Sequence, residues 1–488
     1  IGVVTDYAIF YFSAFRRDLR TGKEPLDAAR HAATTITPVV VVAGVTVAVG
    51  TAALLVAELE LFQRLGPGLA VTVAVAALVA STFVPAAMAW LGRGVFWPRG
   101  IEVVEAERRE PGWRRRLARV GVNRAVALVV LAVGVGGLVY VSLPIGDADV
   151  GANLIEDVPT GHEVERAAEA AATGFVPGIV APGEVLVSAP GIGRDGAALD
   201  RLGSLIGEEP GIAAVLGPGR LPAGEDPGLF VSPEGNVARY AVFLADPPYS
   251  ADAIDRMEAL RERLPGLVEA AGFPDAEVAV AGDTMLAQEI VSTAEDDLIR
   301  IAIATVVIDL LLLALFLRSL VIPVVLLALS ALGVLVAVAT TSWVFTTFLG
   351  YDGLTFYVPF AVAVLLVAFG SDYNIFVVAR IWSEARHRDL REAIVEGGSQ
   401  AGSAIAAAGT VLAASFAMLA LVPIGAFRQF ALGMAVGVLV DTFFIRTVLL
   451  PAAIALLGRW SAWPGRDLEP AEVVSQPTEE PVPPAVRV

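Results

Sequence analysis

The sequence predicts a polytopic α-helical membrane protein with an internal parallel repeat and one soluble α+β domain of the ferredoxin-like kind. Three observations support this fold class. The chain is 56% hydrophobic and only 17% charged, more apolar than soluble proteins, and several apolar runs exceed the roughly 18 residues that span a membrane. One long internal segment is acidic and contains no such run. Motifs near the start of the chain recur 365 or 366 residues later.

Nine apolar segments are predicted to cross the membrane. The first runs from Ile1 to about Phe15, and Asp6 lies only five residues from its start, whereas about fifteen mostly apolar residues precede Asp372 in the matching later segment. We therefore expect the first span to be cut short at its front and the chain to be a fragment of a longer protein. The other eight predicted spans are Ile36–Ala57, Leu69–Leu91, Arg124–Leu143, Ile299–Leu317, Leu320–Thr340, Phe356–Ala379, Ala401–Val422 and Phe430–Leu457.

The distribution of charge predicts the orientation of these spans. Basic residues cluster in the linkers 16–33, 92–123 and 380–391, and such linkers stay on the cytoplasmic side; contact with anionic membrane lipids is a second role open to linker 92–123. Residues 146–297 contain 28 acidic and 8 basic residues, in a chain of net charge −17. Nine alternating spans place this acidic segment opposite the basic linkers. We therefore expect a multi-pass plasma-membrane protein whose acidic domain is extracytoplasmic.

The expected organisation has six parts, each defined by its hydropathy and charge. They are the end of a first transmembrane repeat (1–91, three spans), a basic cytoplasmic linker (92–123), the first span of a second repeat (124–143), the extracytoplasmic domain (144–297), a five-span bundle (298–457) and a disordered cytoplasmic tail rich in proline and glutamate (458–488).

The acidic segment reads as alternating short helices and strands, which favours a ferredoxin-like arrangement. The predicted order is helix Gly161–Ala172, strand Glu184–Ser188, helix Ala197–Gly207, strand Ile212–Leu216, strand Ala238–Leu244, helix Ser250–Ala271 and strand Ala276–Ala281. It contains no set of residues typical of an enzyme, a phosphate loop or a metal site. We expect no cofactor, no metal, no nucleic-acid partner and no enzymatic activity. We interpret Asp283, Asp296 and Asp297 as solvated charges near a domain hinge, with ion sensing as the alternative.

Two Asp-Tyr pairs inside apolar segments are the candidate functional residues. Asp6-Tyr7 follows Gly2, four residues before the aspartate, and Asp372-Tyr373 follows Gly370, two residues before the aspartate. An aspartate in the middle of a span costs about 2.5–3.5 kcal/mol on insertion scales, so such residues usually mark a path for ions or protons. The alternative is a pair of buried aspartates that hold helices together. We predict that Asp6 and Asp372 titrate as a coupled group.

Asp441 and Arg446 lie in the last predicted span. They are five residues apart, about 140° around an α-helix, so we do not expect them to pair with each other. Either one of them reaches the central carboxylates and modulates them, or both are structural charges near the inner face. The hydroxyls of Thr46, Thr51, Thr410 and Ser415 are expected to bond backbone carbonyls, with a water-wire role as the alternative.

The repeat has a nearly constant register. Asp6 and Asp372 are 366 residues apart, Phe62-Gln63-Arg64-Leu65-Gly66 matches Phe427-Arg428-Gln429-Phe430-Ala431 at an offset of 365, and the stretch from Pro85 to Arg93 matches that from Pro451 to Arg459 at 366. The two copies share a direction through the membrane, which indicates a parallel repeat about an axis along the membrane normal.

The chain resembles the MMPL (mycobacterial membrane protein large) family of transporters in the resistance-nodulation-division (RND) superfamily. The resemblance is carried by the Gly-x-x-x-Asp-Tyr helix, by the soluble domain inserted after the first span of a six-span half, and by Asp441-Thr442-Phe443-Phe444-Ile445-Arg446-Thr447 before Pro451. It implies proton-driven export of lipids or other hydrophobic molecules through outer "porter" domains. It also implies that Asp6, Tyr7, Asp372 and Tyr373 form the proton relay, each aspartate near the tyrosine of the opposite copy.

The same sequence features are compatible with other functions. A non-transporting sensor or scaffold, similar to the sterol-sensing relatives of this superfamily, would have the same architecture, and an inactive fragment is a further alternative. A protein-translocation aid is disfavoured by the size of the outer domain and by the tandem repeat. The identity of the hydrophobic substrate and the formation of a homo-oligomer cannot be predicted from these residues.

Overall fold

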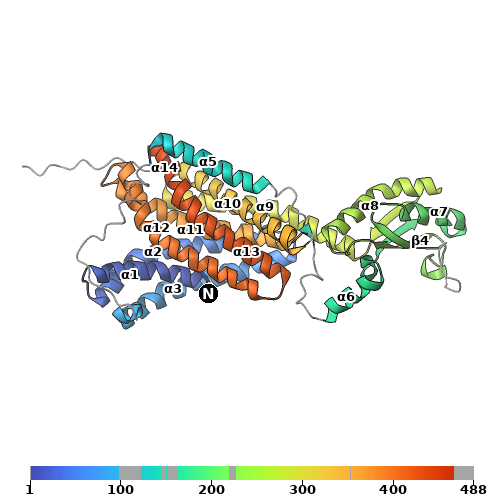
Figure 1. Cartoon of the computed structure of the whole chain (residues 1–488), viewed down its shortest axis with the longest axis horizontal. Helices are drawn as coiled ribbons and strands as arrows, with labels where there is room; N and C mark the ends of the chain where they lie inside the picture. Colours follow the sequence, from blue (N-terminus) through green and yellow to red (C-terminus); the bar gives the residue numbers. More distant parts are fainter. Residues whose placement is uncertain are drawn as a thin grey trace, which may run out of the picture.

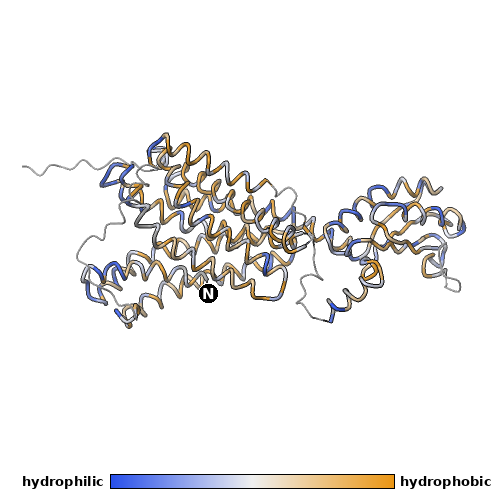
Figure 2. The backbone as a smooth tube through the Cα atoms, in the orientation of Figure 1, coloured by the Kyte–Doolittle hydropathy of each residue, from blue (hydrophilic) through white to orange (hydrophobic). Residues whose placement is uncertain are grey.

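The computed structural model describes residues 2–97, 122–143, 150–151, 163–218, 227–351 and 353–465. These residues form a long helix bundle and a smaller α+β domain at one end of it (Figure 1). Hydrophobic residues dominate the bundle along most of its length, whereas hydrophilic residues gather at its ends and on the domain (Figure 2). We call the end of the bundle nearest the domain the domain end.

The bundle consists of long apolar helices, as the composition predicts. Eight helices of the described residues are long and apolar enough to cross a membrane, which confirms a multi-pass α-helical membrane protein. The remaining predicted span, the first in the chain, is helix α1. It is not among the eight because Asp6 and the charges at its C-terminal end interrupt its apolar stretch. The helices are α1 (Gly2–Arg20), α2 (Pro25–Ala52), α3 (Glu60–Leu91), α5 (Arg124–Ser142), α9 (Asp283–Leu317), α10 (Val321–Leu349), α11 (Tyr357–Ala385), α12 (Leu390–Ala417), α13 (Gly425–Leu439) and α14 (Leu450–Leu457).

Short helical segments of other types complete the bundle. A 3₁₀ turn follows α2, α3, α12 and α14, and a π-helix joins α13 to α14. These segments are η1 (Ala53–Val56), η2 (Gly92–Phe96), η7 (Met418–Leu421), η9 (Gly458–Ala462) and the π-helix η8 (Val440–Leu449).

The α+β domain has the predicted ferredoxin-like topology. Its four strands pair in the order β3-β4-β2-β5, all antiparallel, and α7 and α8 follow the first and third strands, as in a β-α-β-β-α-β unit. Side chains on one face of the sheet pack against these helices around Val185, Leu202 and Tyr240. The elements are α6 (Glu163–Gly174), β2 (Gly183–Ser188), α7 (Gly196–Gly207), β3 (Ile212–Leu216), β4 (Val237–Leu244), α8 (Ala251–Ala271) and β5 (Glu277–Ala281).

Two connections join the domain to the bundle. Helix α9 begins in the domain, directly after β5, and continues into the bundle without a break, so the expected boundary at residue 297 falls inside one helix. Strand β1 (Val150–Gly151) pairs with β6 (Leu354–Thr355) in the loop between α10 and α11. The side-chain oxygen of Gln429 on α13 accepts a hydrogen bond from the Thr355 backbone at 2.9 Å, which ties this second connection to the bundle.

The sequence repeat is also a structural repeat. Helices α2 and α12 both have 28 residues, and the 3₁₀ turns η1 and η7 that follow them both have four. The glycines that end the repeated helices, Gly92 and Gly458, have nearly the same backbone angles, φ 54° and ψ −131° against φ 57° and ψ −129°. A positive φ favours glycine, so both copies use the same residue for the same turn.

The expected disordered tail begins later than residue 458. The turn η9 is ordered, and Ser461 is buried. The hydroxyl of Ser319, in the loop between α9 and α10, donates to the backbone oxygen of Ser461 at 2.8 Å, and the Leu320 amide donates to Trp463 at 2.9 Å. These contacts hold residues 458–465 against the bundle, so this part of the prediction was wrong; residues 466–488 lie outside the described part.

Candidate functional site

The two copies of the repeat meet at an aromatic cluster between α1 and α11. The ring of Phe10 on α1 lies 5.6 Å from the ring of Tyr373 and 5.0 Å from that of Phe376 on α11, measured between centroids. Tyr7 and Tyr373 are buried in the same hydrophobic cluster. The two tyrosines that were predicted from widely separated motifs therefore belong to one packed region in the middle of the bundle.

The two aspartates are located by their positions on these helices. Position 6 is four residues before Phe10 on α1, and position 372 is four residues before Phe376 on α11. Residues four apart share one face of an α-helix, so the two positions lie on the helix faces that contain the touching phenylalanines. The side chains of Asp6 and Asp372 lie outside the described part of the structure, and their role in a relay stays a prediction.

Arg446 lies beside the second Asp-Tyr pair. Its guanidinium carbon is 4.3 Å from the centre of the Tyr373 ring, and its Nη2 atom donates to the backbone oxygen of Gly370 at 3.0 Å. The residue is only 4% exposed. Arg446 thus contacts the residues on either side of positions 371 and 372, inside the apolar part of the bundle.

The expectation that Asp441 and Arg446 do not pair was wrong. Nη2 of Arg446 forms an ion pair with Oδ2 of Asp441. The angle of 140° assumed an α-helix, but these residues lie in the π-helix η8, in which hydrogen bonds join residues five apart. The Thr447 hydroxyl shows the same spacing, because it donates to the carbonyl of Thr442 at 2.9 Å. The wider turn brings side chains five apart onto one face.

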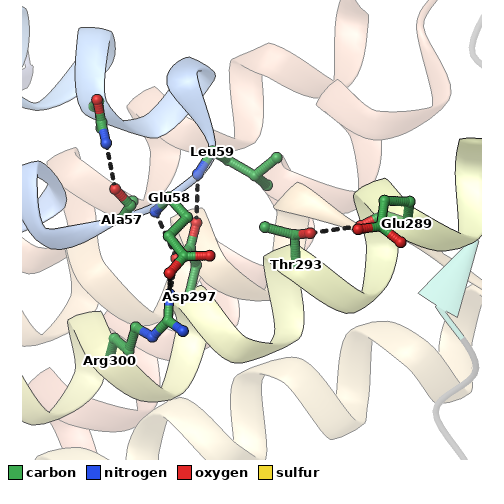
Figure 3. A network of polar contacts seen from close by, with 8 residues as sticks. Ala57, Glu58, Leu59, Glu289, Thr293, Asp297 and Arg300 are labelled. Carbon is green, nitrogen blue, oxygen red and sulfur yellow. Dashed lines mark hydrogen bonds and ion pairs between the residues drawn. The ribbon is translucent and has the colours of Figure 1, made fainter.

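Asp297 forms a second polar network at the domain end of the bundle (Figure 3). Its two carboxylate oxygens accept hydrogen bonds from the backbone amides of Glu58 and Leu59, at 2.7 and 2.8 Å. Arg300 lies 3.6 Å from Asp297 and 2.6 Å from Glu58. Asp297 is fully buried, so its interpretation as a solvated charge was wrong: the turn before α3 covers it.

The expected hydroxyl contacts are present, and two glycines allow close contact between helices. Thr46, Thr51, Thr410 and Ser415 each donate to a backbone carbonyl one turn earlier on their own helix. Close helix contact occurs at Gly44 and Gly409: a Cβ atom built on Gly44 would lie 2.5 Å from Ala77, and one on Gly409 would lie 2.3 Å from Thr442. These contacts confirm the structural role of the four hydroxyls.

Sequence reasoning missed a buried acid, Asp309, in the apolar part of α9. Asp309 is fully buried, and so is Thr305 one turn earlier on the same helix. The signal was present, since an aspartate interrupts the apolar span Ile299–Leu317. Unlike Asp6 and Asp372, Asp309 is not followed by a tyrosine, and the part of the chain before residue 92 contains no segment that matches it in the repeat.

Comparison with known proteins gives consistent results. The model of the MMPL family matches residues 1–128 and 219–476. The Streptomyces coelicolor membrane protein SCO5905 is 34% identical over 95% of this chain and 53% of its own length. The apo-petrobactin exporter of Bacillus anthracis is 28% identical over 97% of this chain and 64% of its own length. The sulfolipid-1 exporter MmpL8 of Mycobacterium tuberculosis is 32% identical over 50% of this chain and 22% of its own length.

The chain therefore spans about half to two thirds of the length of the first two of these relatives. A crystal structure of SecDF in its super-membrane-facing form has a similar fold, with a TM-score of 0.50 at 17% identity over 94% of this chain and 54% of that chain. At this level of identity the similarity shows the fold alone.

Proposed function

Because the chain belongs to the MMPL family, we propose that it takes part in the proton-driven export of a lipid or another hydrophobic molecule across the plasma membrane. Two relatives named as exporters, of apo-petrobactin and of sulfolipid-1, support transport as the general activity. The α+β domain is then extracytoplasmic and forms part of the substrate route, while the basic linkers and the C-terminal tail are cytoplasmic. The excess of basic residues in these linkers supports this orientation.

In this proposal Asp6, Tyr7, Asp372 and Tyr373 form the proton relay. The observation that supports it most directly is the position of Arg446. A buried guanidinium within a span is rare and usually marks an ion or proton path, and this one contacts Gly370 and Tyr373 next to Asp372. The electrostatic interaction between position 372 and the Arg446 guanidinium is strong in an apolar environment, so a change of charge at position 372 changes the energy of Arg446. Asp441, which pairs with Arg446, modulates the same response.

Protonation would then change the packing between the two copies. A proton bound at Asp372 removes a negative charge next to the Tyr373 ring, on which Arg446 and Phe10 both pack. Tyr373 thus connects the charge on η8 with the first copy of the repeat. The membrane potential supplies about 2.3 kcal/mol per proton for each 100 mV, which is enough to shift two packing states of similar free energy.

The proposal is tested with Asp372→Asn and Asp6→Asn in the complete transporter, reconstituted in vesicles that contain a pH-sensitive dye. With a lipid extract of the source cells present, we expect proton uptake under an imposed membrane potential to fall about a hundredfold in both variants, since a positioned proton-transfer group contributes factors of this size. Asp296→Asn is the control, because Asp296 is exposed at the domain end.

Proton uptake by the Asp372→Asn variant at the rate of the unchanged protein would contradict the relay. If the variant also folds and still retains bound lipid, a sensor or scaffold of the sterol-sensing kind becomes the better interpretation. Size-exclusion chromatography shows whether each variant is folded.

A further inference from the structure

We propose that Asp309 and Thr305 on α9 form an additional proton-carrying station, which lies between the domain end of the bundle and position 372. Protons would pass from the domain end to Asp309 and then to the carboxylate of Asp372. The inference rests on the proposed function, because it extends the path that leads to the proposed relay. It assigns a role to a further acid inside the bundle.

The first evidence is the buried face of α9, which carries three polar residues, Asp297, Thr305 and Asp309, among apolar ones. The buried positions Asp297, Ile301, Thr305, Asp309, Leu313 and Leu317 follow one another at intervals of four residues. Residues four apart lie one above the other on a helix, so Thr305 and Asp309 are neighbours on one face. This face leads from the Asp297 network at the domain end toward the middle of the bundle.

The second evidence is the state of Thr305. Its side chain is 3% exposed, and among the described residues its hydroxyl oxygen has no hydrogen-bond partner. Thr46, Thr51 and Thr341, which are also buried in spans, instead donate to a carbonyl of their own helix. The Thr305 hydroxyl can therefore form hydrogen bonds with the carrier that brings a proton to Asp309 or takes one from it.

The third evidence is the position of Asp309 relative to α2 and α11. A Cβ atom built on Gly50 of α2 would lie 3.6 Å from Oδ1 of Asp309 and 3.8 Å from the Cβ atom of Ala368 on α11. Ala368 is one helical turn from position 372 on the same face of α11. The carboxyl group of Asp309 thus lies next to the helix face that carries position 372, about one turn closer to the domain end.

The titratable residues on the described helices that pack against this part of α9 can be named. Helix α10 and the turn η1, which both pack against α9, contain no titratable residue. On α11 the nearest in sequence to Ala368 are Asp372 and Tyr373, and at the domain end Glu58 and Arg300 are engaged with each other. The acids and bases of α2, Asp27, Arg30 and His31, lie at its opposite end. Asp309 and Asp372 are therefore the acids along this part of the path.

The proposed transfer conserves charge and atoms. The Asp309 carboxylate accepts a proton from the domain end and becomes a neutral carboxylic acid. It then gives this proton to the carboxylate at position 372 and returns to its charged form. The Thr305 hydroxyl stays neutral throughout, because it donates one hydrogen bond while it accepts another.

The protonation of Asp309 can be measured without transport. Dicyclohexylcarbodiimide reacts with protonated carboxyl groups in apolar surroundings, and mass spectrometry of the digested protein locates the adduct. We expect labelling of Asp309 in the full chain at neutral pH, with less labelling as the pH rises. Absence of labelling at Asp309 at every pH at which the protein stays folded would overturn the proposal.

Transport provides the second measurement. We expect Asp309→Asn to reduce proton uptake by about tenfold or more and Thr305→Val to reduce it by a smaller factor. Thr341→Val is the matched control, since Thr341 is equally buried but bonds the carbonyl of Ala337 at 2.7 Å. Normal uptake by a folded Asp309→Asn variant, with Asp372→Asn inactive, overturns this inference and leaves the proposed relay intact. Normal uptake by Asp372→Asn instead contradicts the relay itself.

A third variant covers the case in which Asp309→Asn does not fold. Gly50→Ala places a methyl group at an ordinary contact distance from Asp309 Oδ1, so the packing is retained while the space beside the carboxyl group is reduced. We expect this variant to shift the pH dependence of labelling at Asp309. Identical labelling profiles for the variant and the unchanged protein would overturn the proposal.

Discussion

Asp297 shows how one side chain connects the two copies of the repeat. The amides of Glu58 and Leu59 lie just before α3, where a helix leaves its first N–H groups without partners in its own backbone. The N-cap residue Leu59 cannot accept a hydrogen bond through its side chain. The carboxylate of Asp297, on α9, accepts from both amides instead (Figure 3). A negative charge at this helix end is also favoured by the helix dipole.

We expect Asp297→Asn to weaken this connection. Asparagine has one acceptor oxygen where aspartate has two, so one of the two amides loses its partner, at a cost of about 1–3 kcal/mol. Hydrogen exchange measured by mass spectrometry should show faster exchange in the segment that contains Glu58 and Leu59. Asp296→Asn, at the exposed neighbouring position, should leave this exchange unchanged. Equal exchange in both variants would contradict the role of Asp297.

Tyr240 has a comparable role inside the α+β domain. Its hydroxyl donates to the backbone oxygen of Leu199 at 2.9 Å and is buried. Burial, and to a smaller extent the charge of Asp200, raises the pKa of the Tyr240 hydroxyl above its ordinary value of 10.0. Because the folded-state pKa is the higher one, the stability that depends on the protonated hydroxyl is fully present below pH 10 and is lost as the pH rises further.

Two results should follow for Tyr240→Phe. The buried oxygen of Leu199 loses its donor, which should lower the stability of the domain by about 1–2 kcal/mol at neutral pH. The variant should also lose less of its remaining stability above pH 10 than the unchanged protein does. Hydrogen exchange of β4 at several pH values measures both effects. Tyr249→Phe is the comparison, since the exposed hydrogen bond from the Tyr249 hydroxyl to Asp283, at 3.4 Å, should cost less stability at neutral pH when it is lost.

At the scale of elements, the π-helix η8 explains why the repeat offset changes from 365 to 366. Helix α3 has 32 residues, whereas the equivalent stretch Gly425–Leu457 is one residue longer. An extra residue in an α-helix would rotate everything after it by about 100°. The part of the helix before η8 cannot rotate freely, because Gly433 and Gly437 lie directly against Val362 and Leu366 of α11. The extra residue is therefore accommodated as a π-helix.

Deletion of Phe443 should consequently be tolerated. Phe443 lies in η8 and is largely exposed, so its removal lets η8 become an α-helix while both flanking helices keep their register. Asp441 and Arg446 would then be four positions apart and still able to pair. Deletion of Leu335, an exposed residue of α10, should instead disrupt folding, because half of that helix must rotate. Size-exclusion profiles and thermal unfolding compare the two; equal damage in both would contradict this account of η8.

At the scale of the whole molecule, the contact of α1 with α11 joins segments that are hundreds of residues apart in sequence. Figure 1 shows α1 and α3 along one side of the bundle and α5 along the other, with α11 among the helices between them. The Phe10–Phe376 contact lies inside this arrangement. It is the part of the packing that the proposed protonation step would change.

This arrangement can be tested by cross-linking, because the chain contains no cysteine. A variant with Phe10→Cys and Phe376→Cys should react with a short reagent that joins two thiols. A protease site inserted after Trp97 then separates the two halves of the chain, and the halves should remain joined only in the cross-linked sample. Phe83→Cys with Phe376→Cys is the control pair, since Phe83 is 67% exposed on α3. Halves that separate in both samples would contradict the packing of α1 on α11.

Much of this protein follows from the sequence by itself. The order of the spans, the repeat and the seven elements of the α+β domain were predicted, because span length and hydrophobic periodicity depend on residues that are near one another in the chain. The bounds of the seven elements agree closely with the structure, whereas α2, α3, α9 and α12 begin well before the predicted spans. The Asp-Tyr positions were also identifiable, since an acid in an apolar span is unusual. Whether their carboxyl groups meet stays a prediction.

The tertiary structure decided what the remaining charged residues contact. Asp297 is buried because a turn some 240 residues earlier in the chain covers it, and Arg446 reaches Asp441 because the extra residue of the last helix is accommodated as a π-helix. Asp309 gains its place beside α2 and α11 in the same way. Each depends on partners from distant segments, and a charged residue's surroundings are determined only when those segments pack together.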